Sequence, residues 1–134
     1  MPKSVPIPLS LMICDQVVVD SASGKTTIFG AFENILCASF PTALPRLMLF
    51  AELTCGHGPT PITIKFVRTT PDSVDGAVVE KWDLELPFSD PRAIARLGIT
   101  IENIALAQAG EHRFILETEG ALIIERRVLV LPKN

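Results

Sequence analysis

The sequence ITIKFVRT, residues 62–69, alternates apolar and polar side chains along most of its length. One side carries Ile62, Ile64 and Phe66, and the other carries Thr63, Lys65 and Thr69. A period of two residues is typical of a β-strand with one buried and one solvated face. Residues 77–86 repeat the pattern and place Val78, Trp82, Leu84 and Leu86 inward. The two stretches therefore predict half-solvated strands of an antiparallel sheet.

Further runs of strand length fill the rest of the chain, and Pro, Gly, Asp and Ser separate them. The predicted strands are residues 11–19, 26–35, 47–54, 62–69, 77–86, 98–106, 111–118 and 121–131. Ser89-Asp90-Pro91 is a helix-start signal and predicts a short helix near residues 91–97. Residues 111–118 alternate and place His112, Phe114 and Leu116 inward. Glu119-Gly120 predicts a tight hairpin turn. About eight strands without a long amphipathic helix predict an all-β protein, a single antiparallel β-sandwich.

The chain of 134 residues fits one domain, which we place at residues 11–134. Residues 1–10 carry Pro2, Pro6 and Pro8 and predict an extended arm or an edge-lying strand, because proline cannot donate to a sheet ladder. The first strand, residues 11–19, is apolar on both faces except at Asp15-Gln16, and we expect it in the centre of a sheet.

Composition narrows the classes of function. Hydrophobic residues make up 48% of the chain and charged residues 20%, which indicates a folded protein. The net charge of −3 disfavours nucleic acid as a partner, because phosphate binding requires clustered Lys and Arg. No apolar run approaches the roughly 20 residues of a spanning helix, so a membrane is also disfavoured. The first ten residues match no targeting peptide, and three cysteines without a close pair suit a reducing compartment. We expect a cytoplasmic protein.

Two motifs suggest chemistry that their surroundings do not support. Gly24-Lys25-Thr26-Thr27 is similar to the end of a phosphate-binding P-loop, but Val19 stands where that motif begins with glycine, and β-rich sequence follows instead of a helix. A hairpin turn explains these residues better. Cys55-Gly56-His57 offers two metal ligands on one loop, whereas zinc sites draw on paired ligands from two knuckles.

A catalytic cysteine would require His57 or His112 as its base and a third group to orient that base. The sequence has neither a nucleophile elbow nor a glycine-rich oxyanion loop. We therefore predict no catalytic residue, no metal, no cofactor and no enzymatic activity. Asp72 and Asp75 leave open a weak calcium or lipid site in a monomeric binding module, although tight calcium sites recruit more acids.

Several short motifs are spread along the chain. The chain has Cys14-Asp15, Gly24-Lys25 and the segment Ile28 to Ile35, followed by Phe40-Pro41. It closes with Gly110 to Phe114, the turn Glu119-Gly120 and an apolar strand to Val130. These motifs resemble those of a family of short bacterial proteins of unknown function. The resemblance covers nearly the whole chain, implies a cytosolic β-sandwich and supplies no activity. The chain departs from the family in having no tyrosine in the closing strand.

The apolar surface exceeds what one sandwich buries easily. Strands around Leu11, Leu47 and Leu122 are apolar on both faces, more than two inner faces can absorb. We therefore predict a non-enzymatic interaction or structural protein whose partner is a second copy or another protein. The expected contact residues are Val5, Pro6, Ile7, Pro8, Met48 and Phe50.

Overall fold

The computed structural model describes residues 5–133 and contains ten strands. In chain order they are β1 (Ile7–Cys14), β2 (Gln16–Val19), β3 (Thr26–Phe29), β4 (Asn34–Cys37), β5 (Thr42–Thr54), β6 (Gly58–Thr70), β7 (Ser73–Phe88), β8 (Ala95–Leu106), β9 (Gly110–Thr118) and β10 (Ala121–Pro132). Within this described part of the chain, no helix is long and apolar enough to cross a membrane.

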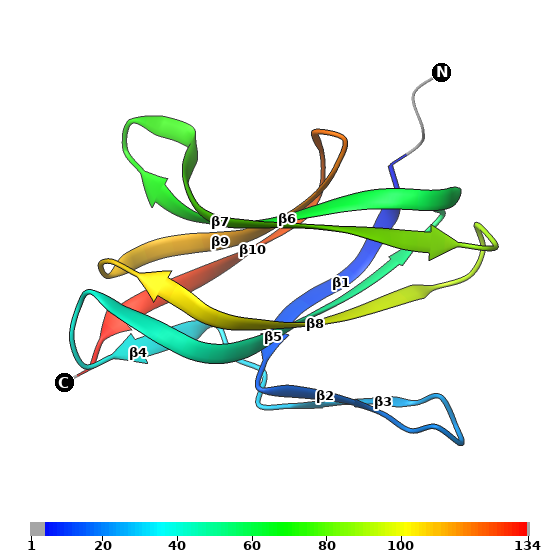
Figure 1. Cartoon of the computed structure of the whole chain (residues 1–134), viewed down its shortest axis with the longest axis horizontal. Helices are drawn as coiled ribbons and strands as arrows, with labels where there is room; N and C mark the ends of the chain where they lie inside the picture. The colour runs from blue at the N-terminus through cyan, green and yellow to red at the C-terminus, as the bar shows by residue number, and fades with distance from the viewer. Residues whose placement is uncertain (1–4, 134) are drawn as a thin grey trace.

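Two sheets face each other, and a short ribbon stands outside them (Figure 1). The five-stranded sheet has the order β4-β10-β9-β6-β7, and the three-stranded sheet has the order β1-β5-β8. β2 and β3 pair only with each other and form the two-stranded ribbon. Pairing is antiparallel except between β4 and β10, which run parallel. The all-β sandwich expected from the alternation at residues 62–69 and 77–86 is confirmed, with one parallel pair added.

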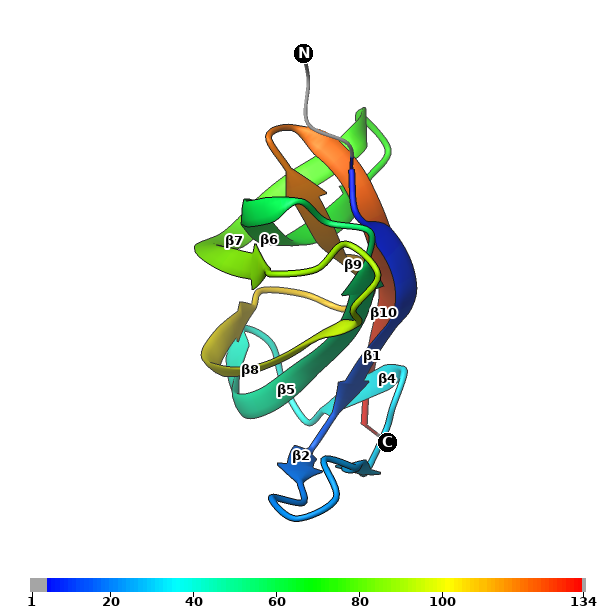
Figure 2. The ribbon, with the colours of Figure 1, turned by 90° about the vertical axis from the view of Figure 1, so that its right-hand side faces the viewer.

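The apolar sides of the two sheets form one core. β9 contributes His112, Phe114 and Leu116, as its alternation predicts, and the ring of Phe66 on β6 lies against the rings of His112 and Phe114. Trp82 is partly buried and packs on the edge of this core. At the open side of the sandwich β1 passes beside β10 (Figure 2), so the sheets approach one another along that seam.

Two predicted strands are each divided in the structure. Residues 11–19 break at Asp15, whose backbone N–H donates to the carbonyl of Phe29, and the chain leaves the three-stranded sheet there to start β2. Residues 26–35 break at Gly30, which has φ = +64°, a conformation that favours glycine. The count is therefore ten strands and not eight.

The short helix predicted near residues 91–97 does not form. The helix-start signal closes only one turn, in which the Asp90 carboxylate accepts a hydrogen bond from the backbone N–H of Arg92. Ala95, Arg96 and Leu97 then pair with β5, and their alternation supplies inward side chains to the core. Tertiary pairing has overridden a local signal.

Two placements at the strand level also differ from expectation. β1 lies at the edge of its sheet, not in the centre. It begins at Ile7, so residues 7–10 form an edge-lying strand, one of the two alternatives expected for residues 1–10, and residues 1–4 lie outside the described residues. Val78 is 56% exposed instead of inward, because a bulge in the β6–β7 pairing places Val79 against the core.

Candidate functional site

The outer face of the three-stranded sheet is built of cross-strand rows. In one row Met12, Phe50 and Gly98 stand side by side on β1, β5 and β8. The next row toward the start of β1 is polar and consists of Ser10, Glu52 and Arg96. The apolar row would face water in an ordinary half-solvated sheet.

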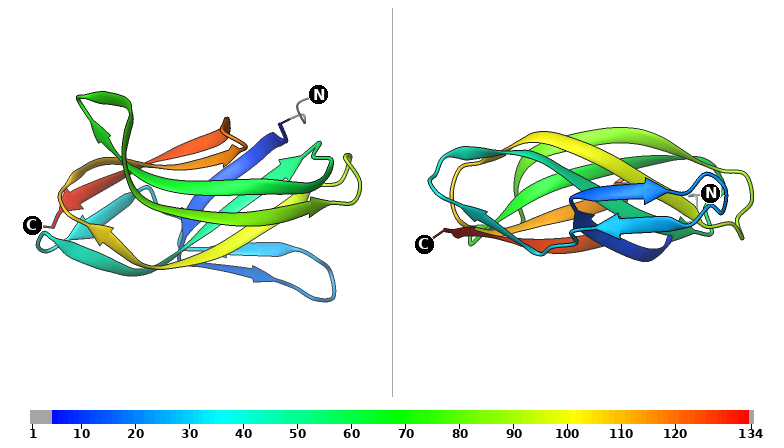
Figure 3. Two further views of the ribbon diagram at one scale, coloured as in Figure 1. Left: turned by 45° about the horizontal axis from the view of Figure 1, so that its top comes forward. Right: turned by 90° about the horizontal axis from the view of Figure 1, so that it is seen from below.

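The ribbon covers part of that apolar row. Seen from below, β2 and β3 lie across the outer face of the sheet (Figure 3, right). A Cβ placed on Gly98 would lie 3.9 Å from both Val17 of the ribbon and Met48 of β5, so the ribbon lies close to the sheet here, although Gly98 itself is exposed. Phe50 is only 5% exposed as a result. The second apolar face of β5 is thus partly buried within one chain.

A groove of about 730 Å³ opens between the turn of the ribbon and this sheet. Its floor is the polar row together with Met12 and Phe50, and its roof comes from residues 23–26 and Ile28. A volume of this size is typical of small-molecule sites, which combine apolar walls with a few polar groups.

The polar end of the groove has unused hydrogen-bond donors. Glu52 accepts from the Ser10 hydroxyl at 3.0 Å and from the Nε of Arg96 at 3.0 Å. The two Nη groups of Arg96 have no acceptor among residues 5–133, and neither has the ammonium of Lys25. The hydroxyl of Thr26 is buried and has no hydrogen-bond partner among these described residues. The groove is lined by two cations, Lys25 and Arg96, and by one carboxylate, Glu52, so it carries an excess of one positive charge.

The outward face and the edges of the ribbon are open. Val18 is 40% exposed and Phe29 is 51% exposed, and both point away from the sheet beneath. Neither β2 nor β3 has a second neighbour in the described chain, so both edges present unpaired backbone groups. Neither strand contains a charged residue or a proline, which are the usual protections of an exposed edge.

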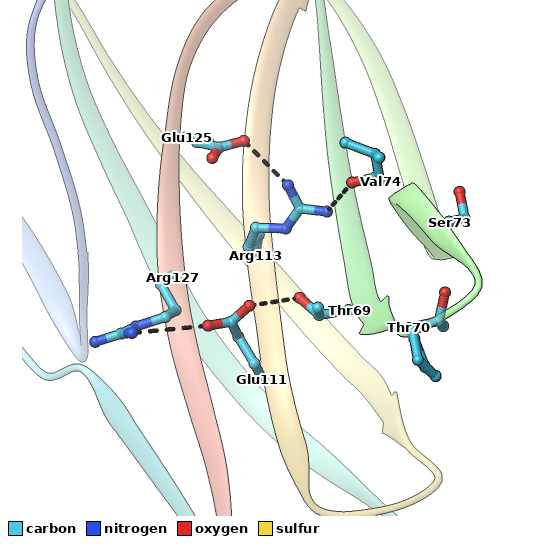
Figure 4. A pocket seen from close by; sticks show the side chains of 9 residues that line it. Thr69, Thr70, Ser73, Val74, Glu111, Arg113, Glu125 and Arg127 are labelled. Carbon is cyan, nitrogen blue, oxygen red and sulfur yellow. Dashed lines mark hydrogen bonds and ion pairs between the residues drawn. The ribbon is translucent and has the colours of Figure 1, made fainter.

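A second depression, of about 720 Å³, lies on the outer face of the five-stranded sheet (Figure 4). Arg113 donates to Glu125 and to the carbonyl of Val74, both at 3.3 Å. Glu111 accepts from the Thr69 hydroxyl at 2.8 Å and lies 3.7 Å from Arg127. Two cations and two carboxylates balance here, and their contacts fasten the end of the β6–β7 hairpin to the sheet.

The histidines and cysteines singled out in the sequence lie apart. His112 is buried against Phe66, and its Nδ1 lies 3.1 Å from the carbonyl of Gly110. Burial lowers the pKa of His112, with the nearby charge of Arg68 as a minor cause, whereas the contact with Gly110 opposes the shift. Burial likewise raises the pKa of the Cys14 thiol. Among the described residues no hydrogen bond joins either histidine to a cysteine.

The two loops considered as ligand sites are shorter than expected. β6 ends at Thr70 and β7 begins at Ser73, so Asp72 stands in a tight turn and Asp75 already lies in a strand. His57 is exposed on the short connection from β5 to β6. Over residues 5–133 no three His, Cys, Asp or Glu side chains gather to hold a metal ion.

The predicted contact residues divide by exposure. Val5 is 38% exposed and Ile7 is 51% exposed, and both are open to a partner. Pro6 is buried, Pro8 and Met48 are partly buried, and Phe50 is buried beneath the ribbon. Phe50 therefore is not a free contact surface in the single chain.

The hairpin predicted around Gly24-Lys25 is confirmed, because β2 and β3 pair antiparallel on either side of this turn. Sequence reasoning missed that the hairpin leaves the sheet as a separate ribbon and forms a groove with it. The available signal was the uncharged, β-branched composition of residues 16–19 and 26–29. It was obscured because residues 11–19 form one continuous apolar run apart from Asp15-Gln16. Lys25 indicates a hairpin turn by its place in the sequence and not a groove, and Arg96 gives no signal because its role depends on a neighbour 44 positions away, Glu52.

The sequence of residues 9–131 matches a family model described as a family of unknown function (DUF6941). The chain belongs to this family. The match confirms the resemblance drawn from Cys14-Asp15 and the closing Gly110 to Val130 segment, and the family adds no activity. No curated protein matches the chain in sequence.

Solved structures resemble the chain only distantly. An immunoglobulin-like protein from Pseudomonas aeruginosa is 19% identical, with 95% of this chain and 96% of that chain covered and a TM-score of 0.48. A β-glucosidase from Kluyveromyces marxianus in complex with glucose is 11% identical with a TM-score of 0.47, covering 77% of this chain and 14% of that one. A β-glucosidase from Listeria innocua is 9% identical with a TM-score of 0.45, covering 91% of this chain and 16% of that one. At these scores the similarities carry no argument about function.

Proposed function

We propose that this protein is a non-enzymatic interaction module that associates with a second copy of itself through the β2–β3 ribbon. The observation that carries the proposal is the ribbon's pair of unprotected edges. Six of its eight residues are β-branched, and no charge or proline interrupts either strand. Such an edge is a template for strand addition, and natural proteins usually protect it.

A second copy satisfies the ribbon best. An isolated two-stranded ribbon is marginal in water, whereas three or more strands with an apolar face are stable. Two ribbons that pair edge to edge about a two-fold axis form four strands, and the same surface serves both copies. The exposed Val18 and Phe29 of both copies would then lie on one face of this four-stranded sheet. The open Val5 and Ile7 supply further area at the start of the chain.

A non-catalytic role in the cytoplasm is part of this proposal, and two other features agree with it. Cys14, Cys37 and Cys55 are free cysteines, as a reducing compartment allows. The groups that would be needed for hydrolysis are spread over the fold, and His112 is part of the core. The association would serve as the structural unit of a larger assembly.

Native mass by light scattering over a tenfold concentration range tests the proposal. We expect the wild-type chain to exceed the 14.6 kDa of one copy, and Val18→Lys to return it to that mass. Val74→Lys is the matched control, because Val74 is 94% exposed at the turn of β6–β7, outside the ribbon. The control should keep the wild-type mass.

A wild-type mass of one copy throughout the range would overturn self-association. Association through the ribbon is also overturned if Val18→Lys and Val74→Lys lower the mass equally, because the ribbon would then have no special part. Circular dichroism of both variants shows that they remain folded.

A further inference from the structure

We propose that the groove between the ribbon and the three-stranded sheet binds a small amphiphilic carboxylate, with its carboxylate on Arg96 and Lys25 and its alkyl chain over Met12 and Phe50. This site is separate from the ribbon edges of the proposed self-association, although the ribbon forms its roof. The arrangement of charged and apolar side chains in the groove supports this site.

The carboxylate end is set by Arg96. Its Nε is held by Glu52 at 3.0 Å, which fixes the guanidinium plane at the end of the floor. The Nη donors have no acceptor in the described residues, and an arginine fork matches a carboxylate with two parallel hydrogen bonds. Lys25, which also lacks a partner among these residues, supplies a second cation from the roof.

The apolar end follows directly along the sheet. The row that contains Met12 and Phe50 is adjacent to the row that contains Arg96, so an alkyl chain extends from the carboxylate over apolar side chains. Ile28 closes this end from the ribbon. Thr26 also lines the roof, and its hydroxyl is buried within the fold and not open to the groove.

The excess of one positive charge favours an anion over a neutral or cationic ligand. The groove is open to solvent beside the ribbon, and its volume of about 730 Å³ accommodates a small molecule. A carboxylate with an alkyl tail satisfies both ends at once. A short inorganic anion would leave the apolar row empty.

Isothermal titration with straight-chain carboxylates from hexanoate to decanoate, below their micelle concentrations, tests the site on the intact chain. Affinity should rise about fourfold for each methylene until the floor is filled. Arg96→Gln should weaken decanoate binding about tenfold or more, and Lys25→Gln by less. Arg92→Gln is the matched control, since Arg92 is an exposed arginine that pairs with Asp90 outside the groove. It should bind as the wild type does.

Decanol and acetate complete the experiment. Each carries only one of the two recognised features, so each should bind at least tenfold more weakly than decanoate. No binding of decanoate, equal binding of decanol, or equal losses in Arg96→Gln and Arg92→Gln would overturn the proposal. Val18→Lys separates this site from self-association, because a single-copy variant that still binds decanoate shows that the groove functions alone.

A peptide that ends in a carboxylate is the competing occupant. The hexapeptide acetyl-AVLAVL with a free C-terminus, titrated beside its amidated form, distinguishes it. Carboxylate-dependent peptide binding tighter than that of decanoate would replace the small-molecule proposal. Weaker binding of the peptide supports it.

Discussion

Arg113 on β9 stands directly opposite Arg127 on β10, so two like charges form a cross-strand pair on the outer face of the five-stranded sheet. Opposed like charges destabilise a sheet, and each arginine is offset by a carboxylate on the partner strand. Arg113 contacts Glu125 and Arg127 lies near Glu111, so each ion pair runs diagonally from one strand to the other. Because the Arg113 side chain is only 17% exposed, we expect its ion pair with Glu125 to contribute more to stability than the ion pair of Arg127 with Glu111.

Removal of that carboxylate should destabilise the protein. Glu125→Gln leaves Arg113 facing Arg127 with the nearest compensation lost, and we expect the free energy of unfolding to fall by about 1 kcal/mol. Urea denaturation measures this loss, and 1 M NaCl should reduce it by screening the repulsion. Adding Arg127→Gln should recover part of the loss.

Glu33→Gln provides the comparison, because Glu33 is 73% exposed and pairs with Arg126 at the surface. A change within about 0.5 kcal/mol is expected there. If Glu33→Gln and Glu125→Gln cost the same, the Arg113–Arg127 opposition has no energetic consequence.

Two glycines should respond to alanine with opposite signs. A Cβ on Gly56 would overlap the ring of the buried Phe88, so Gly56→Ala forces either the β5–β6 connection or the ring to move. We expect a loss of about 1–3 kcal/mol in the free energy of unfolding. Calorimetric melting of the purified variant measures it.

Gly98→Ala is the matched substitution on β8. Its Cβ would make ordinary contacts at 3.9 Å with Met48 and Val17, beneath the ribbon. Less backbone freedom in the unfolded chain should then raise stability by up to about 1 kcal/mol. A lower melting temperature for Gly98→Ala would mean that Met48 and Val17 lie too close to residue 98 to accept a methyl group.

Stability should fall in mild acid because of His112. Burial holds the pKa of His112 below its ordinary value near 6.5, so the folded chain resists protonation where the unfolded chain accepts a proton. Protonation of His112 therefore costs no folding stability above about pH 6.5. Below that pH the free energy of unfolding decreases as the pH falls toward the lowered pKa. Urea midpoints between pH 5 and pH 8 measure this slope.

His112→Phe should flatten that slope whatever its effect on absolute stability, since the buried ring no longer titrates. His57→Gln is the control at an exposed histidine and should keep the wild-type slope. An unchanged slope in His112→Phe would assign the pH dependence to other groups.

The ribbon should act as a cover for Phe50. Ile28 faces the sheet, so Ile28→Asp places a charge against the apolar row and should lift the ribbon. We expect stronger binding of a hydrophobic dye and faster hydrogen exchange at residues 16–29, with about 1–3 kcal/mol lost.

Thr27→Asp tests the neighbouring position, whose exposed side chain lies on the opposite face of the ribbon. It should leave dye binding unchanged. Equal dye binding in the two variants would show that the ribbon's inner face does not protect Phe50.

The amino-acid sequence by itself determined the all-β class, the core alternation of His112, Phe114 and Leu116, and the turn at Glu119-Gly120. These features depend on residues that are close in sequence. An alternation with a period of two, or a glycine at a turn that requires positive φ, can therefore be recognised directly. The helix-start signal at Ser89 was equally local, and it was wrong because pairing of residues 95–97 with β5 outweighed it.

Only the tertiary structure decided where the apolar surplus goes and where the candidate site lies. Whether Phe50 faces water depends on a ribbon that departs at Asp15 and folds back over the sheet. The groove exists because Arg96 and Glu52 become neighbours through pairing of β8 with β5. Such contacts join residues far apart in the chain, and strand order, register and the path of the ribbon establish them together, so no single stretch of sequence contains them.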